Sequence, residues 1–171
     1  MPAAPHDEFP PALTAIAQID FSHGTIDYDP RDAFLSPEET ASWIRAWTGN
    51  DDLSGDDFRV FGQDGTGGYT AFWLVRPGAP LPDQPVVFLG SEGEIAVVAR
   101  NLADYLWLLA NGIGPSEVAN HSEYPARPNP TLLPLAERFA PGRDRSPAAV
   151  ITAAAEEFPD FEQTINDLCR Y

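Results

Sequence analysis

The chain has 171 residues, of which 43% are apolar, and its 26 acidic and 10 basic residues give a formal net charge of −16. A chain of this length and apolar fraction can bury the core of one domain, which argues against full disorder. All ten basic residues are arginines, so chemistry that depends on lysine, such as a P-loop or a Schiff base, is excluded. The negative charge argues against binding to nucleic acid or an anionic membrane, and favours a basic protein as partner.

Cys169 is the single cysteine, so no disulfide can form within the chain. Its solitary occurrence suits a reducing compartment. The N-terminus carries no signal-peptide pattern, and no apolar run approaches the roughly 18 residues of a membrane span. We therefore expect a cytoplasmic protein that does not contact a membrane.

The first element along the chain is weakly defined. Residues 1–12 are rich in proline and predict a loose N-terminal arm. Apolar residues alternate over 19–28 around turn-forming residues at 22–25, and this pattern predicts a weak hairpin.

A helix is predicted more firmly after residue 35. The segment 36–39, Ser-Pro-Glu-Glu, supplies an N-cap serine, a proline at the first helical position and a capping-box glutamate. Trp43 and Trp47 lie on one face of this helix, which ends at Gly49. An acidic polar loop over 50–57 follows.

The middle of the chain predicts strands, and the remainder predicts helices. The strands cover 58–61, 69–75, 86–89 and 95–99, with the last two joined as a hairpin. The helices cover 101–111, 131–140, 146–158 and the residues from 160 onward, while 114–130 predicts an irregular proline-rich stretch. The pattern indicates a single α+β domain over 1–171, with a largely antiparallel sheet flanked by helices and a helical C-terminal extension over 114–171.

Two motifs invite a ligand-binding interpretation. The glycine-rich run at 61–69 could cradle a phosphate, but it lacks a lysine and lies between two strands, so a tight turn is the better account. Asp27, Asp29 and Glu38 match three positions of a calcium-loop template, but Arg31 stands where an oxygen ligand is needed. We expect no metal site, no cofactor and no catalytic constellation.

The acidic residues are concentrated in the first part of the chain. Residues 1–64 hold 13 acidic and 3 basic residues, whereas 65–171 hold 13 and 7. The residues that define a candidate docking surface for a basic protein are Asp51, Asp52, Asp56, Asp57, Asp64, Trp43 and Trp47. A solubilising face around an ordinary core is the alternative interpretation.

Residues 58–73, FRVFGQDGTGGYTAFW, resemble the strand-turn-strand signature of the SUKH superfamily, which contains yeast cell-wall-assembly regulators and many bacterial immunity proteins. The continuation is also similar, with PVVFL at 85–89, IAVVA at 95–99 and a helix over 101–111. The N-terminal region and the extension after Gly114 depart from the common pattern of that family.

The resemblance implies an α+β sheet flanked by helices and a non-enzymatic intracellular binding function. By this resemblance we expect an immunity protein that neutralises a toxin domain by occlusion. The alternative is a housekeeping scaffold or regulator of the cell-wall-assembly type, with several weak partners.

Overall fold

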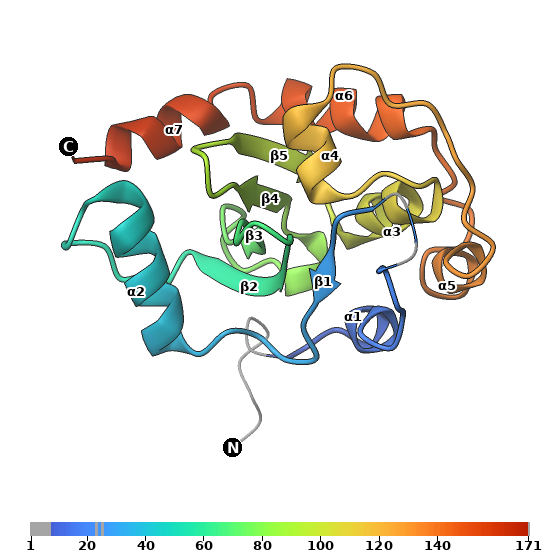
Figure 1. The fold of residues 1–171 in the computed structure, drawn as a ribbon, viewed down its shortest axis with the longest axis horizontal. Helices are drawn as coiled ribbons and strands as arrows, with labels where there is room; N and C mark the ends of the chain where they lie inside the picture. Colours follow the sequence, from blue (N-terminus) through green and yellow to red (C-terminus); the bar gives the residue numbers. More distant parts are fainter. Residues whose placement is uncertain (1–7, 23, 25, 171) are drawn as a thin grey trace.

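The computed structural model describes residues 8–22, 24 and 26–170, which form an α+β fold built on a five-stranded antiparallel sheet (Figure 1). The strands lie in chain order: β1 (Asp29–Pro30), β2 (Phe58–Gln63), β3 (Tyr69–Trp73), β4 (Val86–Leu89) and β5 (Ile95–Ala99). Each strand therefore pairs with the one that follows it along the chain, so the connections between strands need no crossover.

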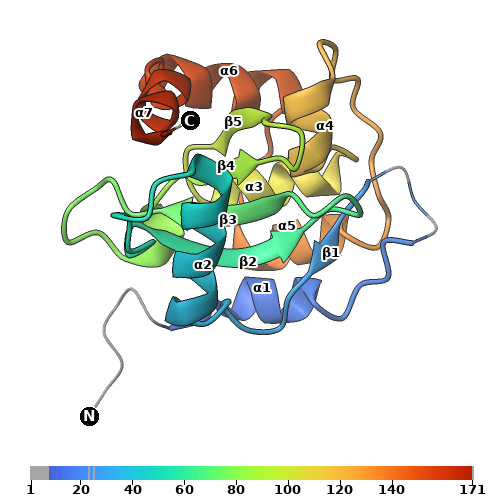
Figure 2. The same cartoon turned by 60° about the vertical axis from the view of Figure 1, so that its left-hand side comes forward.

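Helices surround this sheet on both faces and along one edge (Figures 1 and 2). The helices within the described residues are α1 (Pro11–Ile16), α2 (Pro37–Thr48), α3 (Leu102–Ala110), α4 (Pro115–Asn120), α5 (Leu133–Phe139), α6 (Pro147–Glu157) and α7 (Phe161–Leu168), with a 3-10 turn η1 (Leu81–Asp83). No helix among these residues is long and apolar enough to cross a membrane.

Both faces of the sheet are buried, each by its own apolar cluster. On one face Val60, Val87 and Leu89 pack in a cluster with Ile44 of α2 and Ile165 of α7. The other face contributes to a larger cluster that includes residues of α1, α3, α5 and α6. A sheet covered on both faces requires apolar side chains at consecutive positions, which explains why its strands read as nearly continuous apolar runs.

The strongest sequence signals are confirmed. Strands β4 and β5 occupy the predicted residues. Helix α2 begins with the amide of Glu39 donating to the Ser36 side chain at 3.1 Å and ends at Gly49 in the left-handed conformation, φ 67°. Helix α3 is capped by Asn101, whose side chain accepts from the amide of Asp104 at 2.8 Å.

The predicted hairpin over 19–28 is wrong. The described residues of this segment form no strand, and the first strand is β1 at Asp29–Pro30. Phe21, Ile26 and Tyr28 are nevertheless buried. The apolar alternation therefore indicates which side chains are buried, although the main chain of this segment does not pair as a strand. Residues 23 and 25, at the expected turn, lie outside the described residues.

The loose arm and the irregular stretch also need correction. Residues 1–7 lie outside the described part, but α1 begins at Pro11 and buries Ala12 in the core. Helix α4 lies within the stretch expected to be irregular. Helices α1 and α4 have six residues each, which is too short to display a helical period.

Candidate functional site: an acidic docking surface

The two tryptophans of the predicted surface attach α2 to the sheet. The ring of Trp43 lies 5.2 Å from that of Tyr69 and 5.9 Å from that of Phe58. Trp47 donates its indole N–H to the main-chain oxygen of Gly90 at 2.8 Å. Both side chains are only partly buried, so they anchor the helix and also leave aromatic surface beside it.

The loop between α2 and β2 is held in place by specific hydrogen bonds. The buried Asn50 donates from Nδ2 to the main-chain oxygen of Leu168 at 2.8 Å and accepts from the amide of Asp52 at 3.0 Å. Arg45 donates to the main-chain oxygen of Leu53 at 2.7 Å. Gly55 has φ 77°, and a Cβ at this position would lie only 3.1 Å from Cγ2 of Thr40. The loop therefore has a defined conformation, fixed to both α2 and α7.

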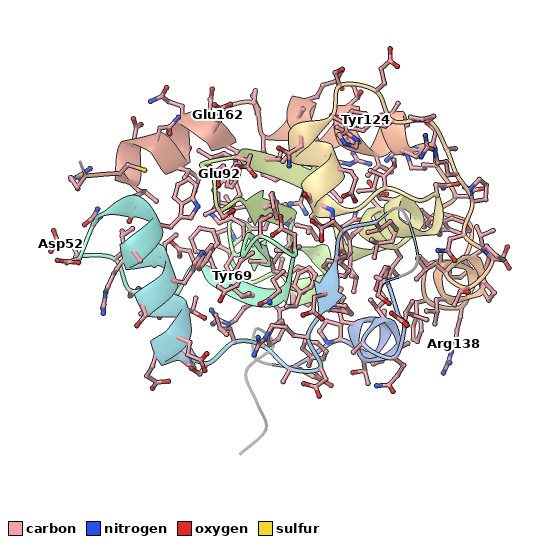
Figure 3. The ribbon with its side chains drawn as sticks, in the orientation of Figure 1. Asp52, Tyr69, Glu92, Tyr124, Arg138 and Glu162 are labelled. Atoms are coloured by element: carbon pink, nitrogen blue, oxygen red, sulfur yellow. The ribbon has the colours of Figure 1, made fainter. Side chains whose placement is uncertain are left out.

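Four aspartates project from this loop into solvent. Asp51, Asp52, Asp56 and Asp57 are exposed, and none of their carboxylates accepts a hydrogen bond or ion pair from a described residue. Figure 3 places Asp52 at one end of the long axis and Arg138 at the other. The four carboxylates are thus available to a cationic partner, and their position at one end of the molecule focuses the negative field there.

Asp64 does not belong to this surface, and its assignment as a docking residue is corrected. Its side chain is 4% exposed. One carboxylate oxygen accepts from the amide of Thr66 at 3.0 Å, from the Thr66 hydroxyl at 2.8 Å and from the amide of Gly68 at 2.8 Å. Asp64 therefore fixes the β2–β3 turn and is not available to a partner.

The structure adds α7 to this end of the molecule. Helix α7 packs beside α2, and the amide of Arg170 donates to the main-chain oxygen of Thr48 at 2.7 Å. Glu162 and Asp167 of this helix are exposed, and Figure 3 shows Glu162 at the end of α7 that lies away from Asp52. The apolar face formed by Phe161 and Ile165 predicted a helix, but nothing in the sequence placed that helix against α2.

The glycine-rich turn offers little to an anion. The amide of Gly65 donates to the Asp27 carboxylate at 2.9 Å, and the Asp64 carboxylate accepts hydrogen bonds from the amides of Thr66 and Gly68. The amide of Gly67 donates to the main-chain oxygen of Asp64. Since carboxylates and a main-chain oxygen already accept from these amides, the turn is a structural one and not a phosphate cradle.

A second polar cluster lies around Glu117 of α4, which is 8% exposed. Its two oxygens accept from the amides of Gly114 at 3.0 Å and Asp27 at 3.2 Å, which ties α4 to the segment before β1. Burial raises the pKa of Glu117, and these two amides oppose the shift. Within the described residues, no group of three or more histidine, cysteine or acidic side chains could hold a metal ion.

Comparison with known proteins finds no matching family model, no matching curated protein and no matching solved structure.

Proposed function

We propose that this chain is a non-enzymatic binding protein that neutralises a basic toxin domain in the cytoplasm by occluding it. Two features support the proposal: the SUKH-like pattern over 58–111, and an ordered loop that presents four exposed aspartates whose carboxylates have no partner among the described residues. The second feature carries the proposal, because a rigid acidic surface can occupy the place of a nucleic acid on a basic enzyme.

The mechanism requires no chemistry on this chain. Carboxylates on the α2–β2 loop steer the basic partner during encounter, and the partly exposed Trp43 and Trp47 supply apolar contact area beside them. Because the loop is already ordered by Asn50 and Gly55, little conformational entropy is lost on association.

The proposal is tested with a variant in which Asp51, Asp52, Asp56 and Asp57 are replaced by asparagine. The partner is captured from the native cytoplasm with the wild-type chain, identified by mass spectrometry, and titrated by calorimetry at several salt concentrations. We expect about 10- to 100-fold weaker binding and a flatter dependence of affinity on salt.

A matched control neutralises four exposed carboxylates elsewhere, with Asp32→Asn, Glu123→Gln, Glu137→Gln and Asp144→Asn. It changes the net charge by the same amount, so it should leave most of the affinity and the salt slope intact. Equal losses in the two variants would refute the assignment of this surface. Capture of several weak partners in place of one tight partner would refute the immunity function and favour a regulator.

A further inference from the structure

A proline-rich segment, residues 124–130 with the sequence YPARPNP, lies between α4 and α5. Residues 123–129 belong to no helix, strand or turn. Every residue of the segment except Ala126 is a proline or precedes one. Because the proline ring fixes φ at about −65° and the residue before a proline is restricted to extended conformations, the favoured structure of the segment is a polyproline II helix.

This segment runs over the outside of the molecule on its way from α4 to α5 (Figures 1 and 2). Its exposed residues are Pro125, Ala126, Arg127, Pro128 and Pro130. Pro125 and Pro128 are three residues apart, which is one turn of a polyproline II helix, so their rings lie on the same side. The segment therefore presents proline rings to solvent, where a partner can reach them.

Hydrogen bonds fix the inner side of the segment to the end of α3. The amide of Arg127 donates to the main-chain oxygen of Asn111 at 2.7 Å, and the amide of Asn129 donates to that of Ala110 at 2.8 Å. The segment is thus held in an extended form before any partner binds. A ligand that is already ordered loses less conformational entropy on association.

A second pair of prolines has the same spacing but a different backbone. Pro77 and Pro80 are also exposed and three residues apart. Gly78 between them has φ 75°, whereas a polyproline II helix requires φ of about −75°. Pro77 and Pro80 therefore lie around a turn, and they provide a matched control for the segment 124–130.

Arg127 gives the segment a positive charge. Its side chain is exposed and makes no hydrogen bond or ion pair with the part of the chain that the structure describes. Residues 124–145 hold four arginines and two acidic residues, although the whole chain has a net charge of −16. Charge complementarity therefore favours a partner with carboxylates beside the groove that receives the prolines.

We propose that residues 124–130 are a polyproline II ligand for a partner domain that has an aromatic-lined groove with carboxylates on its rim. Pro125 and Pro128 pack between the aromatic side chains of the groove, and Arg127 pairs with a carboxylate beside them. Figure 3 shows Tyr124 far from Asp52, so this segment is separate from the acidic loop after α2. The proposal does not depend on toxin neutralisation.

The test titrates purified SH3 and WW domains, which bind proline-rich segments in aromatic grooves, into the isotope-labelled chain and follows the titration by NMR. We expect at least one domain to bind and to shift the amide signals of Ala126, Arg127, Asn129 and Thr131. The amides of Arg127 and Asn129 should stay protected from exchange, because the partner contacts the opposite side of the segment.

Two pairs of variants locate the binding. Pro125→Ala combined with Pro128→Ala should weaken binding by about tenfold or more, whereas Pro77→Ala combined with Pro80→Ala should leave it unchanged. Arg127→Ala should weaken binding and flatten its dependence on salt, and the exposed Arg138→Ala should do neither. Thermal unfolding confirms that all four variants fold.

Three results would overturn the proposal. The first is that no domain of either class binds. The second is binding that shifts signals of the 50–57 loop and leaves those of 124–131 unchanged, as expected for adsorption to the acidic surface. The third is an equal loss of affinity in the two double proline variants, which would show that the extended conformation of 124–130 is not what the partner recognises.

Discussion

The buried core contains two tyrosine hydroxyls without a well-formed hydrogen bond. Tyr28 and Tyr105 are almost fully buried, and neither hydroxyl bonds a described residue with good geometry. Burial raises the pKa of both phenols, so both remain neutral at physiological pH. An unpaired buried hydroxyl lowers stability, because the desolvation of the group is not compensated.

Removing one of these hydroxyls should therefore lower the free energy of unfolding little or not at all. We expect Tyr105→Phe to leave the free energy of unfolding unchanged or to raise it by up to about 1 kcal/mol, measured by urea denaturation. Tyr124→Phe is the control, because the Tyr124 hydroxyl donates to the Val118 oxygen at 3.0 Å. The control should lose about 1 kcal/mol; a comparable loss for Tyr105→Phe would show that its hydroxyl has a partner.

Asp64 should matter for stability and not for binding. Asp64→Ala leaves the amides of Thr66 and Gly68 without their acceptor, and we expect a loss of about 2–3 kcal/mol in the free energy of unfolding. Asp51→Ala, on the exposed loop, should change it by less than about 0.5 kcal/mol. Denaturation of the two variants side by side provides the measurement, and equal stabilities would contradict the assigned role of Asp64.

At the scale of elements, Glu117 connects α4 to the segment before β1. Since burial raises the pKa of Glu117, the folded state retains its proton to higher pH than the unfolded state does. This carboxyl therefore contributes stability below its ordinary pKa and loses that contribution as the pH rises through the raised pKa.

Glu117→Gln removes that titration. The stability of the variant relative to wild type should rise between about pH 4 and pH 7, whatever constant penalty the substitution adds. Urea denaturation at intervals across this range measures the difference, with the exposed Glu137→Gln as control. A difference that stays constant with pH would show that Glu117 titrates normally.

Elements with local signals were predictable, and short elements were not. Ser36 caps the N-terminus of helix α2 and Gly49 caps its C-terminus, so the bounds of the helix follow from the residues at its two ends. Helix α1 has no side-chain cap, and β1 pairs only because β2 lies beside it. Long-range packing and not local pattern therefore decided these two elements.

Over the whole molecule, charge is unevenly distributed. Four of the ten arginines lie within 127–145: Arg127, Arg138, Arg143 and Arg145. Arg138 and Asp52 project at opposite ends of the long axis (Figure 3). A net charge of −16 with this asymmetry implies self-repulsion at the acidic end, which lowers the stability of the folded state.

Screening this repulsion should stabilise the protein. We expect the melting temperature to rise by about 2–4 °C between 20 and 300 mM NaCl, followed by circular dichroism. The variant with asparagine at 51, 52, 56 and 57 should melt higher at low salt and gain less from added salt. A melting temperature that falls or stays flat with salt would contradict this account.

The sequence by itself determined the capped helices α2 and α3, the strands β2 to β5, the α+β class and the exposed aspartates of the 50–57 loop. Each depends on residues close together in the chain, through capping, apolar periodicity or local polarity. Tertiary structure alone decided that Asp64 is buried in a turn and that α7 lies beside α2. These features depend on which distant segments meet, because burial and pairing are set by neighbours in space and not by neighbours in sequence.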